Sequence, residues 1–294
     1  MHILENKALK VTVANRGAEL AGVLDKAACL ERIWTADPAV WNRHAPILFP
    51  FVGKVFGGTY WTGGREYAMK TQHGFARDLP FQCVEETESS VTHSLADTEQ
   101  TRAIYPFAFC LRVTHALDRE NERLLHIRWE VENRGEDTMF YSIGGHPGFL
   151  LPPGVNKEDC FLMLQGCDTP CYFNVNADGF ALPEQKHVLC PENGLVKYAA
   201  DIPDTWIFGN HQIKTAGIAL PDSAPYVTLR CTEFPLVAVW ANPKGRFICL
   251  EPWFGRTDDA GFRGTLEEKP GIECLSPGKI RSISYSILFH PMGS

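Results

Sequence analysis

Apolar and polar residues alternate in short runs along most of the chain, which is the pattern of half-buried β-strands. Polar, Asn and Gly residues separate the runs, and the chain holds 25 Gly and 20 Pro. This spacing predicts an all-β sandwich or barrel. The predicted strands span residues 9–13, 90–96, 107–116, 124–131, 161–164, 205–208, 226–231, 236–241, 247–251 and 282–289.

Turn signals support the same prediction. Residues 57–67 form a predicted hairpin that turns at Gly63-Gly64. Helical periodicity is scarce: residues 36–41 predict one short turn with Asp37 as its cap and Pro38 at its first position, and residues 191–198 an irregular segment. No repeat, low-complexity tract or linker divides the chain, so we expect one domain over residues 1–294.

Composition and charge limit the classes of partner. The net charge of −7 provides no basic surface for nucleic acid or an anionic membrane, and it is compatible with a neutral ligand such as a sugar. Residues 1–7 lack a secretory signal pattern, and no apolar run has the length of a membrane helix. The ten cysteines include no C-x-x-C pair, and the spacing of those at positions 160, 167, 171 and 190 matches no standard zinc motif. We therefore expect a cytoplasmic protein.

The stretch at 141–149 concentrates unusual backbone chemistry around one imidazole. Gly144 and Gly145 precede His146, and Pro147 follows it. Glycine permits close approach to the backbone, and proline favours an extended conformation at the residue before it. The stretch therefore indicates a titratable ring held in a fixed direction, or alternatively a strand-end turn that the histidine merely caps.

Two further stretches carry candidate chemistry. In residues 72–78, His73 precedes a glycine and Arg77 follows it; in residues 247–253, an apolar strand ends in Glu251, a proline and Trp253. Partial desolvation beside an indole raises the pKa of a carboxyl group, which suits Glu251 to general-base catalysis. The alternatives are a Glu251 salt-bridged to Arg256 at a sheet rim, and a Trp253 that packs there instead of stacking on a sugar.

Other chemistries are less well supported. His73, His146 and Glu251 could form a two-histidine, one-carboxylate metal site, although such ligands often lie close together in sequence. Histidines within strand-like runs, such as His93 and His115, are interpreted as structural. The sequence lacks a G-x-S-x-G motif, a P-loop and a G-x-G-x-x-G after a strand, which disfavours serine hydrolases, NTPases and dinucleotide enzymes.

Taken together, these stretches resemble the aldose 1-epimerase (galactose mutarotase) superfamily, and within it the LacX-like branch. The resemblance covers nearly the whole chain, and the order and spacing of the motifs carry it. The matching segments are residues 4–6, 17–20, 33–37, 41, 46–50, 52–54, 72–78, 105–107, 142–149, 250–253 and 275–278.

The resemblance implies a large antiparallel β-sandwich with a sugar in an open cleft. It implies an isomerase that interconverts the α and β anomers of a hexose by acid/base ring opening, without a metal or redox cofactor. His146 would protonate the ring oxygen, Glu251 would remove the proton of the anomeric hydroxyl, and His73 would hydrogen-bond the sugar near its anomeric centre. The two groups would face each other across the sugar, with His146 protonated and Glu251 ionised at the start.

The resemblance also implies substrate-binding roles for Lys54, Arg77, Asp204 and Trp253. This chain has Gly53-Lys54 where better-studied mutarotases have Asn-Arg, and residues 73–75 are His-Gly-Phe, not His-Gly-Gly. Hexose-6-phosphate mutarotases share the Gly-Phe-Ala-Arg element, so Arg77 either binds a phosphate or braces the cleft. The expected ligand is a sugar or sugar phosphate, and the expected assembly is a monomer or homodimer.

Two rival functions remain open. One is a carbohydrate-binding or sensing protein that keeps the fold and the cleft without turnover; the presence of both histidines and the glutamate favours an enzyme. The other is a metal-dependent isomerase or oxygenase of the cupin type.

Overall fold

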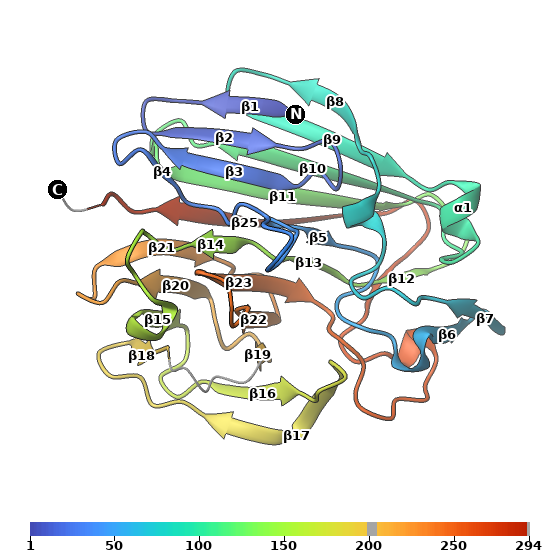
Figure 1. Ribbon diagram of the computed structural model, residues 1–294. Coiled ribbons are helices and arrows are strands. Elements are labelled where there is room, and N and C mark those ends of the chain that lie inside the picture. The colour runs from blue at the N-terminus through green and yellow to red at the C-terminus, as the bar shows by residue number, and fades with distance from the viewer. Residues whose placement is uncertain (199–204, 293–294) are drawn as a thin grey trace.

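The computed structural model describes residues 1–198 and 205–292. Nearly all of its regular structure is β-strand, and neighbouring strands pair in antiparallel fashion (Figure 1). The predicted all-β class is therefore confirmed. No helix among these residues is long and apolar enough to cross a membrane.

One of the two large sheets has nine strands within the described residues. Buried residues alternate with more exposed ones along its central strands, so one face packs on the core. In sheet order its strands are β18 (Leu195–Lys197), β15 (Phe161–Gln165), β20 (Thr215–Ala219), β21 (Pro225–Arg230), β25 (Ile280–Phe289), β11 (Leu124–Asn133), β10 (Phe109–Leu117), β9 (Ser90–Ala96) and β8 (Gln82–Glu86).

The other large sheet has eight strands within the described residues, and every residue of its strand β23 is buried. Ile248, Leu250 and Phe254 of β23 belong to the main hydrophobic core, whereas the residues that alternate with them face away from it. Its strands are β17 (Ala181–Val188), β16 (Cys171–Val175), β19 (Thr205–Phe208), β22 (Leu236–Trp240), β23 (Phe247–Phe254), β13 (Ile143–Gly145), β5 (Ile47–Leu48) and β14 (Gly148–Leu150), the last paired with β23.

Smaller elements complete the described chain. Figure 1 shows the N-terminal four-stranded sheet beside β9–β11, and β1 contacts β9 and β10. This sheet comprises β1 (His2–Glu5), β2 (Leu9–Val13), β3 (Leu20–Asp25) and β4 (Leu30–Glu31). The remaining elements are the pairs β6 (Thr59–Thr62)–β7 (Arg65–Ala68) and β12 (Met139–Tyr141)–β24 (Glu273–Leu275), the helix α1 (Glu99–Arg102), and the 3-10 turns η1 (Phe56–Gly58), η2 (Ala76–Asp78), η3 (Lys157–Asp159) and η4 (Leu266–Glu268).

The local predictions hold where the pattern is strong. β9 and β19 have the predicted bounds, and the hairpin β6–β7 turns at Gly63-Gly64, both at positive φ. Residues 36–41 contain a turn in which the Trp41 N–H donates to the carbonyl of Asp37. The segment at 191–198, which was expected to be irregular, contains β18, because residues 195–197 pair with the edge of β15.

Candidate functional site

The site begins with the register of β23 against β13 and β14. Gly144 pairs with Trp253 and Gly148 with Cys249, so the position midway between the glycines, His146, lies opposite Glu251. Directly opposed residues of antiparallel strands project from the same face. The two residues predicted to act together, 105 positions apart in the sequence, are therefore cross-strand neighbours.

The strand that carries His146 is interrupted at this point. Pro147 has no N–H to donate to β23, and the N–H groups of His146 and Gly148 instead donate to the carbonyls of Pro46 and His44 on the other side. A Cβ at Gly144 would lie 2.4 Å from Cδ1 of Trp253, which explains the glycine. The sequence therefore fixes His146 against Glu251 from both sides.

The two side chains are in close contact, but some of their polar atoms lack hydrogen bonds. His146 Nε2 lies 3.3 Å from Glu251 Oε2, and the residues are only 8% and 1% exposed. Neither His146 Nδ1 nor Glu251 Oε2 has a correctly oriented hydrogen-bond partner in the described part of the chain. Buried polar atoms are normally hydrogen-bonded, so these two atoms point to a ligand.

Burial shifts the pKa values of Glu251 and His146 so that the neutral form of each group is favoured. Desolvation raises the pKa of Glu251 well above 4.5, and the nearby Trp253 indole opposes this rise, although its N–H is not aligned for a hydrogen bond. Desolvation, followed by the charge of Arg77, lowers the pKa of His146. Burial therefore favours a protonated Glu251 beside a neutral His146 over the ion pair. The side chains also lie side by side instead of facing each other across a sugar.

Two tryptophans hold the imidazole of His146. The Trp41 ring lies 4.9 Å from it, centroid to centroid, at 32°, and the Trp240 ring lies 5.5 Å away at 81°. The two indoles also touch each other, at 5.5 Å. This aromatic setting restricts the ring's rotation and keeps water from most of its surface, which accounts for part of the desolvation.

His73 reaches the same place from the other side. Its ring lies 5.7 Å from that of His146 in an edge-on arrangement. The Gly53 N–H donates to His73 Nδ1 at 3.0 Å, so the neutral ring carries its proton on Nε2. Desolvation, and then the charges of His146, Arg77, Lys54 and Arg43, lower the pKa of His73 well below 6.5. His73 is thus a neutral donor of one N–H.

Lys54 and Thr257 join two loops into one wall. Lys54 Nζ donates to the carbonyl of Asp178 at 2.6 Å, and its backbone N–H donates to Thr257 Oγ1 at 3.1 Å. The Thr257 hydroxyl in turn donates to the carbonyl of Gly179 at 2.8 Å. A Cβ at Gly53, which has φ of +73°, would lie 2.3 Å from that of Thr257, so glycine is required there.

A buried ion pair supports this wall from behind. Asp258 Oδ1 pairs with Lys269 Nζ, and each side chain is 3% exposed. Asp258 Oδ2 accepts the Phe56 N–H at 2.7 Å, and the Asp258 N–H donates to the carbonyl of Lys54. Asp258 therefore fixes the 54–56 loop through both its side chain and its backbone.

Arg77 brings a positive charge to the site. Its Nη2 donates to the carbonyl of Gln72 at 2.7 Å, while its buried Nε lies 3.8 Å from Asp78 Oδ2 and has no hydrogen-bond partner among residues 1–198 and 205–292. Burial, and then the charge of Arg43, lower the pKa of Arg77 to about 10, against the opposing effects of Asp78 and Glu19. Arg77 remains a cation at neutral pH.

These side chains line one cavity of about 250 Å³, which we call the cleft. Most predicted site residues meet there: His146, Glu251, His73, Lys54, Arg77 and Trp253. Asp204 lies outside the described residues. Glu251 makes no ion pair with Arg256, whose Nη1 instead lies 2.6 Å from Asp259 Oδ1. The other lining residues are Trp41, Gly53, Gln72, Val175, Gly179, Thr205, Ile207, Trp240, Asn242 and Thr257.

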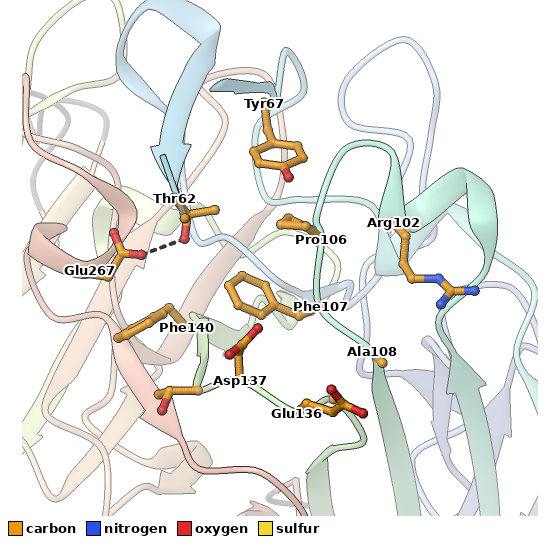
Figure 2. A pocket seen from close by; sticks show the side chains of 13 residues that line it. Thr62, Tyr67, Arg102, Pro106, Phe107, Ala108, Glu136, Asp137, Phe140 and Glu267 are labelled. Atoms are coloured by element: carbon orange, nitrogen blue, oxygen red, sulfur yellow. Dashed lines mark hydrogen bonds between the residues drawn. The ribbon is translucent and has the colours of Figure 1, made fainter. Parts of the chain in front are cut away.

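A second, larger hollow of about 550 Å³ lies near the β6–β7 hairpin, and we call it the outer pocket (Figure 2). Figure 2 shows its aromatic rings and carboxylates, with the Thr62 hydroxyl donating to Glu267 at 2.6 Å. It is lined by Thr62, Gly63, Tyr67, Arg102, Pro106, Phe107, Ala108, Gly135, Glu136, Asp137, Thr138, Phe140 and Glu267.

Sequence reasoning assigned no role to several cleft residues. Trp41 entered only as part of the resemblance, and Trp240, Asn242 and Thr257 were not singled out. Their role depends on packing between strands and loops, which local patterns do not report. An aromatic residue at the end of an apolar strand, as at Trp240, is the one signal that could have indicated a site.

Comparisons with known proteins identify the family of this chain. The family model described as "Aldose 1-epimerase" matches residues 1–184. Protein LacX (chromosomal) of Lactococcus lactis subsp. lactis is 30% identical over 302 residues, covering 97% of each chain.

Solved structures show the same fold over the full length. A galactose mutarotase related enzyme from Lactobacillus acidophilus is 32% identical with a TM-score of 0.91, covering 99% of this chain and 97% of that one. A galactose mutarotase-like protein from Lactobacillus casei is 31% identical with a TM-score of 0.89, covering 99% of this chain and all of that one. The chain therefore belongs to the aldose 1-epimerase family.

Proposed function

We propose that this protein is a mutarotase, which interconverts the α and β anomers of a free or 6-phosphorylated hexose in the cleft. The observation that carries the proposal is the buried contact of His146 with Glu251, in which His146 Nδ1 and Glu251 Oε2 have no hydrogen-bond partner among the described residues. A binding protein has no need of an acid beside a base. A cleft of about 250 Å³ suits a small ligand such as a monosaccharide.

Ring opening requires two proton transfers. Glu251, when ionised, takes the proton of the anomeric hydroxyl, while protonated His146 gives its proton to the ring oxygen and the bond from that oxygen to C1 breaks. Both oxygens are bonded to C1 in the closed sugar, so a base and an acid 3.3 Å apart can serve them together. Each positioned group typically contributes 10²–10⁴-fold to the rate.

Ring closure reverses the transfers after rotation about the C1–C2 bond. Once the ring has opened, the proton is on Glu251 and His146 is neutral, which is the form that burial favours for both groups. The site is therefore electrostatically matched to the open-chain intermediate. Proton exchange across the 3.3 Å contact connects this neutral form with the ion pair that starts ring opening.

The surrounding residues would orient the sugar. His73, a donor through Nε2, would bind an oxygen near the anomeric centre. Arg77 and Lys54 would bind hydroxyls or a phosphate, and Trp253 would form an apolar wall. Lys54 Nζ already donates to the Asp178 carbonyl, so Lys54 would hold the loop at Asp178 in place and contact the ligand at the same time.

The test is anomer exchange followed by polarimetry or NMR on α-glucose, α-galactose and glucose 6-phosphate. We expect acceleration over the spontaneous rate for at least one sugar, lost in His146→Ala. The sugar with the highest kcat/KM identifies the substrate class.

Two results would refute the proposal. Binding of a sugar with no acceleration would support the sensing function instead. Acceleration that survives in both His146→Ala and Glu251→Gln would place the chemistry elsewhere.

A further inference from the structure

Cys249 lies beside the proposed proton-transfer pair and has no role in the proposed mechanism. It precedes Glu251 by two positions on β23, so both side chains project from the same face of the strand. A ring nitrogen of His146, Sγ of Cys249 and a carboxylate oxygen of Glu251 all lie within 4.8 Å of one another, and all three residues are buried. His73 does not belong to this group, so the metal triad considered from the sequence is replaced by a different one.

The donor set is one that zinc-class cations prefer. Zinc binds a thiolate at about 2.3 Å and imidazole or carboxylate at about 2.0–2.2 Å, so donors that share one ion lie roughly 3–4 Å apart. His146 Nε2 and Glu251 Oε2 already have this separation, at 3.3 Å. Cys249 and Glu251 share one strand and His146 stands opposite, so the backbone holds all three donors in place.

Charge and burial favour the same ligand. A thiolate and a carboxylate together carry two negative charges, which balance a divalent cation in a site with little water. Glu251 is 1% exposed, and its Oε2 has no hydrogen-bond partner among the described residues. Because Glu251 and His146 line the cleft, an ion can reach the group through it.

We propose that His146, Cys249 and Glu251 form a binding site for a thiophilic divalent cation such as Zn²⁺ or Cd²⁺, and that the bound ion inhibits anomer exchange. Binding displaces to solvent the thiol proton and the proton that Glu251 and His146 share, while water takes the fourth position on the metal. The ion then occupies the lone pairs that proton transfer requires. Binding stands independently of turnover, whereas inhibition rests on the proposed function.

A second group of similar composition provides a matched control. His2, Cys83 and Glu86 also place three donor atoms within 4.8 Å of one another, beside the edge strand β8, and none of the three lines the cleft. Cys83→Ser removes the sulfur from this group and leaves the cleft intact.

The experiment titrates the metal-free protein with Cd²⁺ and follows thiolate-to-cadmium absorption in the ultraviolet. A parallel titration with Zn²⁺ follows anomer exchange of the preferred sugar. It compares wild type with Cys249→Ser, Cys249→Ala and Cys83→Ser, after circular dichroism has shown that each variant is folded. Two substitutions at position 249 guard against a defect peculiar to the serine hydroxyl.

We expect the Cys249 variants to keep their basal exchange rate, to lose one cadmium–thiolate band, and to need about 10–100-fold more Zn²⁺ for half-inhibition. Cys83→Ser should be inhibited like wild type, and a chelator should restore its activity. Equal Cd²⁺ absorption in wild type and the Cys249 variants would overturn the binding site. Zn²⁺ that accelerates exchange would overturn the inhibition. A protein without mutarotase activity that still shows the Cys249-dependent band would refute the proposed function alone.

Discussion

The cleft and the outer pocket are both hollows, and the smaller one holds the candidate chemistry. In the outer pocket the carboxylate of Glu267 is exposed and accepts the Thr62 hydroxyl, and Arg102 lies 3.2 Å from Asp97. In the cleft the carboxylate of Glu251 is buried and Oε2 lacks an aligned partner. Volume alone would favour the outer pocket over the cleft.

The pKa values of the two glutamates are shifted in opposite directions. Although partial burial pushes the pKa of Glu267 upward, hydrogen bonds led by that from Thr62 bring it below 4.5. Desolvation drives the pKa of Glu251 the other way. A carboxyl group needs a raised pKa to exchange protons near neutrality, so of these two glutamates Glu251 is the one suited to act as a base.

The largest expected effect separates these two glutamates. Glu251→Gln removes the proton acceptor while keeping the side chain's size, so the exchange rate should fall about 10²–10⁴-fold while sugar binding persists. Glu267→Gln in the outer pocket should exchange anomers at the wild-type rate. Saturation-transfer NMR gives the rate and calorimetry the binding; equal rates in the two variants would remove the distinction between the hollows.

Ion pairs behind the two hollows should differ in their contribution to stability. Lys269→Met leaves Asp258 as an unpaired buried charge, and we expect the free energy of unfolding to fall by about 3–5 kcal/mol. Arg102→Met breaks an exposed pair with Asp97 and should cost at most about 1 kcal/mol. Urea denaturation measures both. A similar small loss in each variant would show that Asp258 does not hold the cleft wall.

Replacing a glycine should reduce stability more in the cleft than in the outer pocket. Gly144→Ala would place a Cβ 2.4 Å from Trp253 Cδ1, and such overpacking costs about 1–3 kcal/mol. Gly135→Ala in the outer pocket would come no closer than 3.3 Å to any atom, the nearest being Asn133 Oδ1, and should cost less. Thermal denaturation gives the stability change. A raised KM in Gly144→Ala alone would show that Trp253 walls the sugar site, and an unchanged KM would exclude that role.

The smallest expected effect concerns pH. At low pH His146 gains a proton, so that the pair with Glu251 holds two protons and kcat/KM falls. Because the pKa of His146 is lowered, we expect this fall below pH 6.5. The raised pKa of Glu251 moves the alkaline limb upward from 4.5. Arg77→Gln removes a charge that lowers the pKa of His146, so its acid limb should move toward higher pH. Arg102→Gln should leave the limb in place, and an unmoved limb in both variants would contradict the assignment.

Local patterns were sufficient for about half of the strands that the structure describes. Alternation at residues 90–96 gave the bounds of β9, because strand burial has a period of two. A short apolar run, buried at three of its four residues, gave the bounds of β19. Residues 171–188 gave no such signal, although they form β16 and β17. The residues of β17 from Glu184 on are exposed, so no burial pattern marked them.

The site was predictable in part. Glycines, prolines and single titratable residues indicated His146 and Glu251, but their partnership came from the resemblance. The structure explains it through a cross-strand register that is constant from Gly144 to Gly148. That register, and the packing of Trp41 on His146, depend on contacts distant in sequence and are absent from any local pattern.

The central claim is that His146 and Glu251 act as one proton-sharing pair, and a double-mutant cycle tests it most directly. Anomer exchange above the spontaneous rate would be measured by NMR for His146→Ala, Glu251→Gln and the double variant, at protein concentrations high enough to resolve each residual rate. Groups that act as a unit are strongly non-additive.

We predict that the double variant exchanges anomers within about threefold of the slower single variant, since either substitution already breaks the pair. A double variant slowed by the product of the two single effects would show that the groups act independently, and would contradict the account.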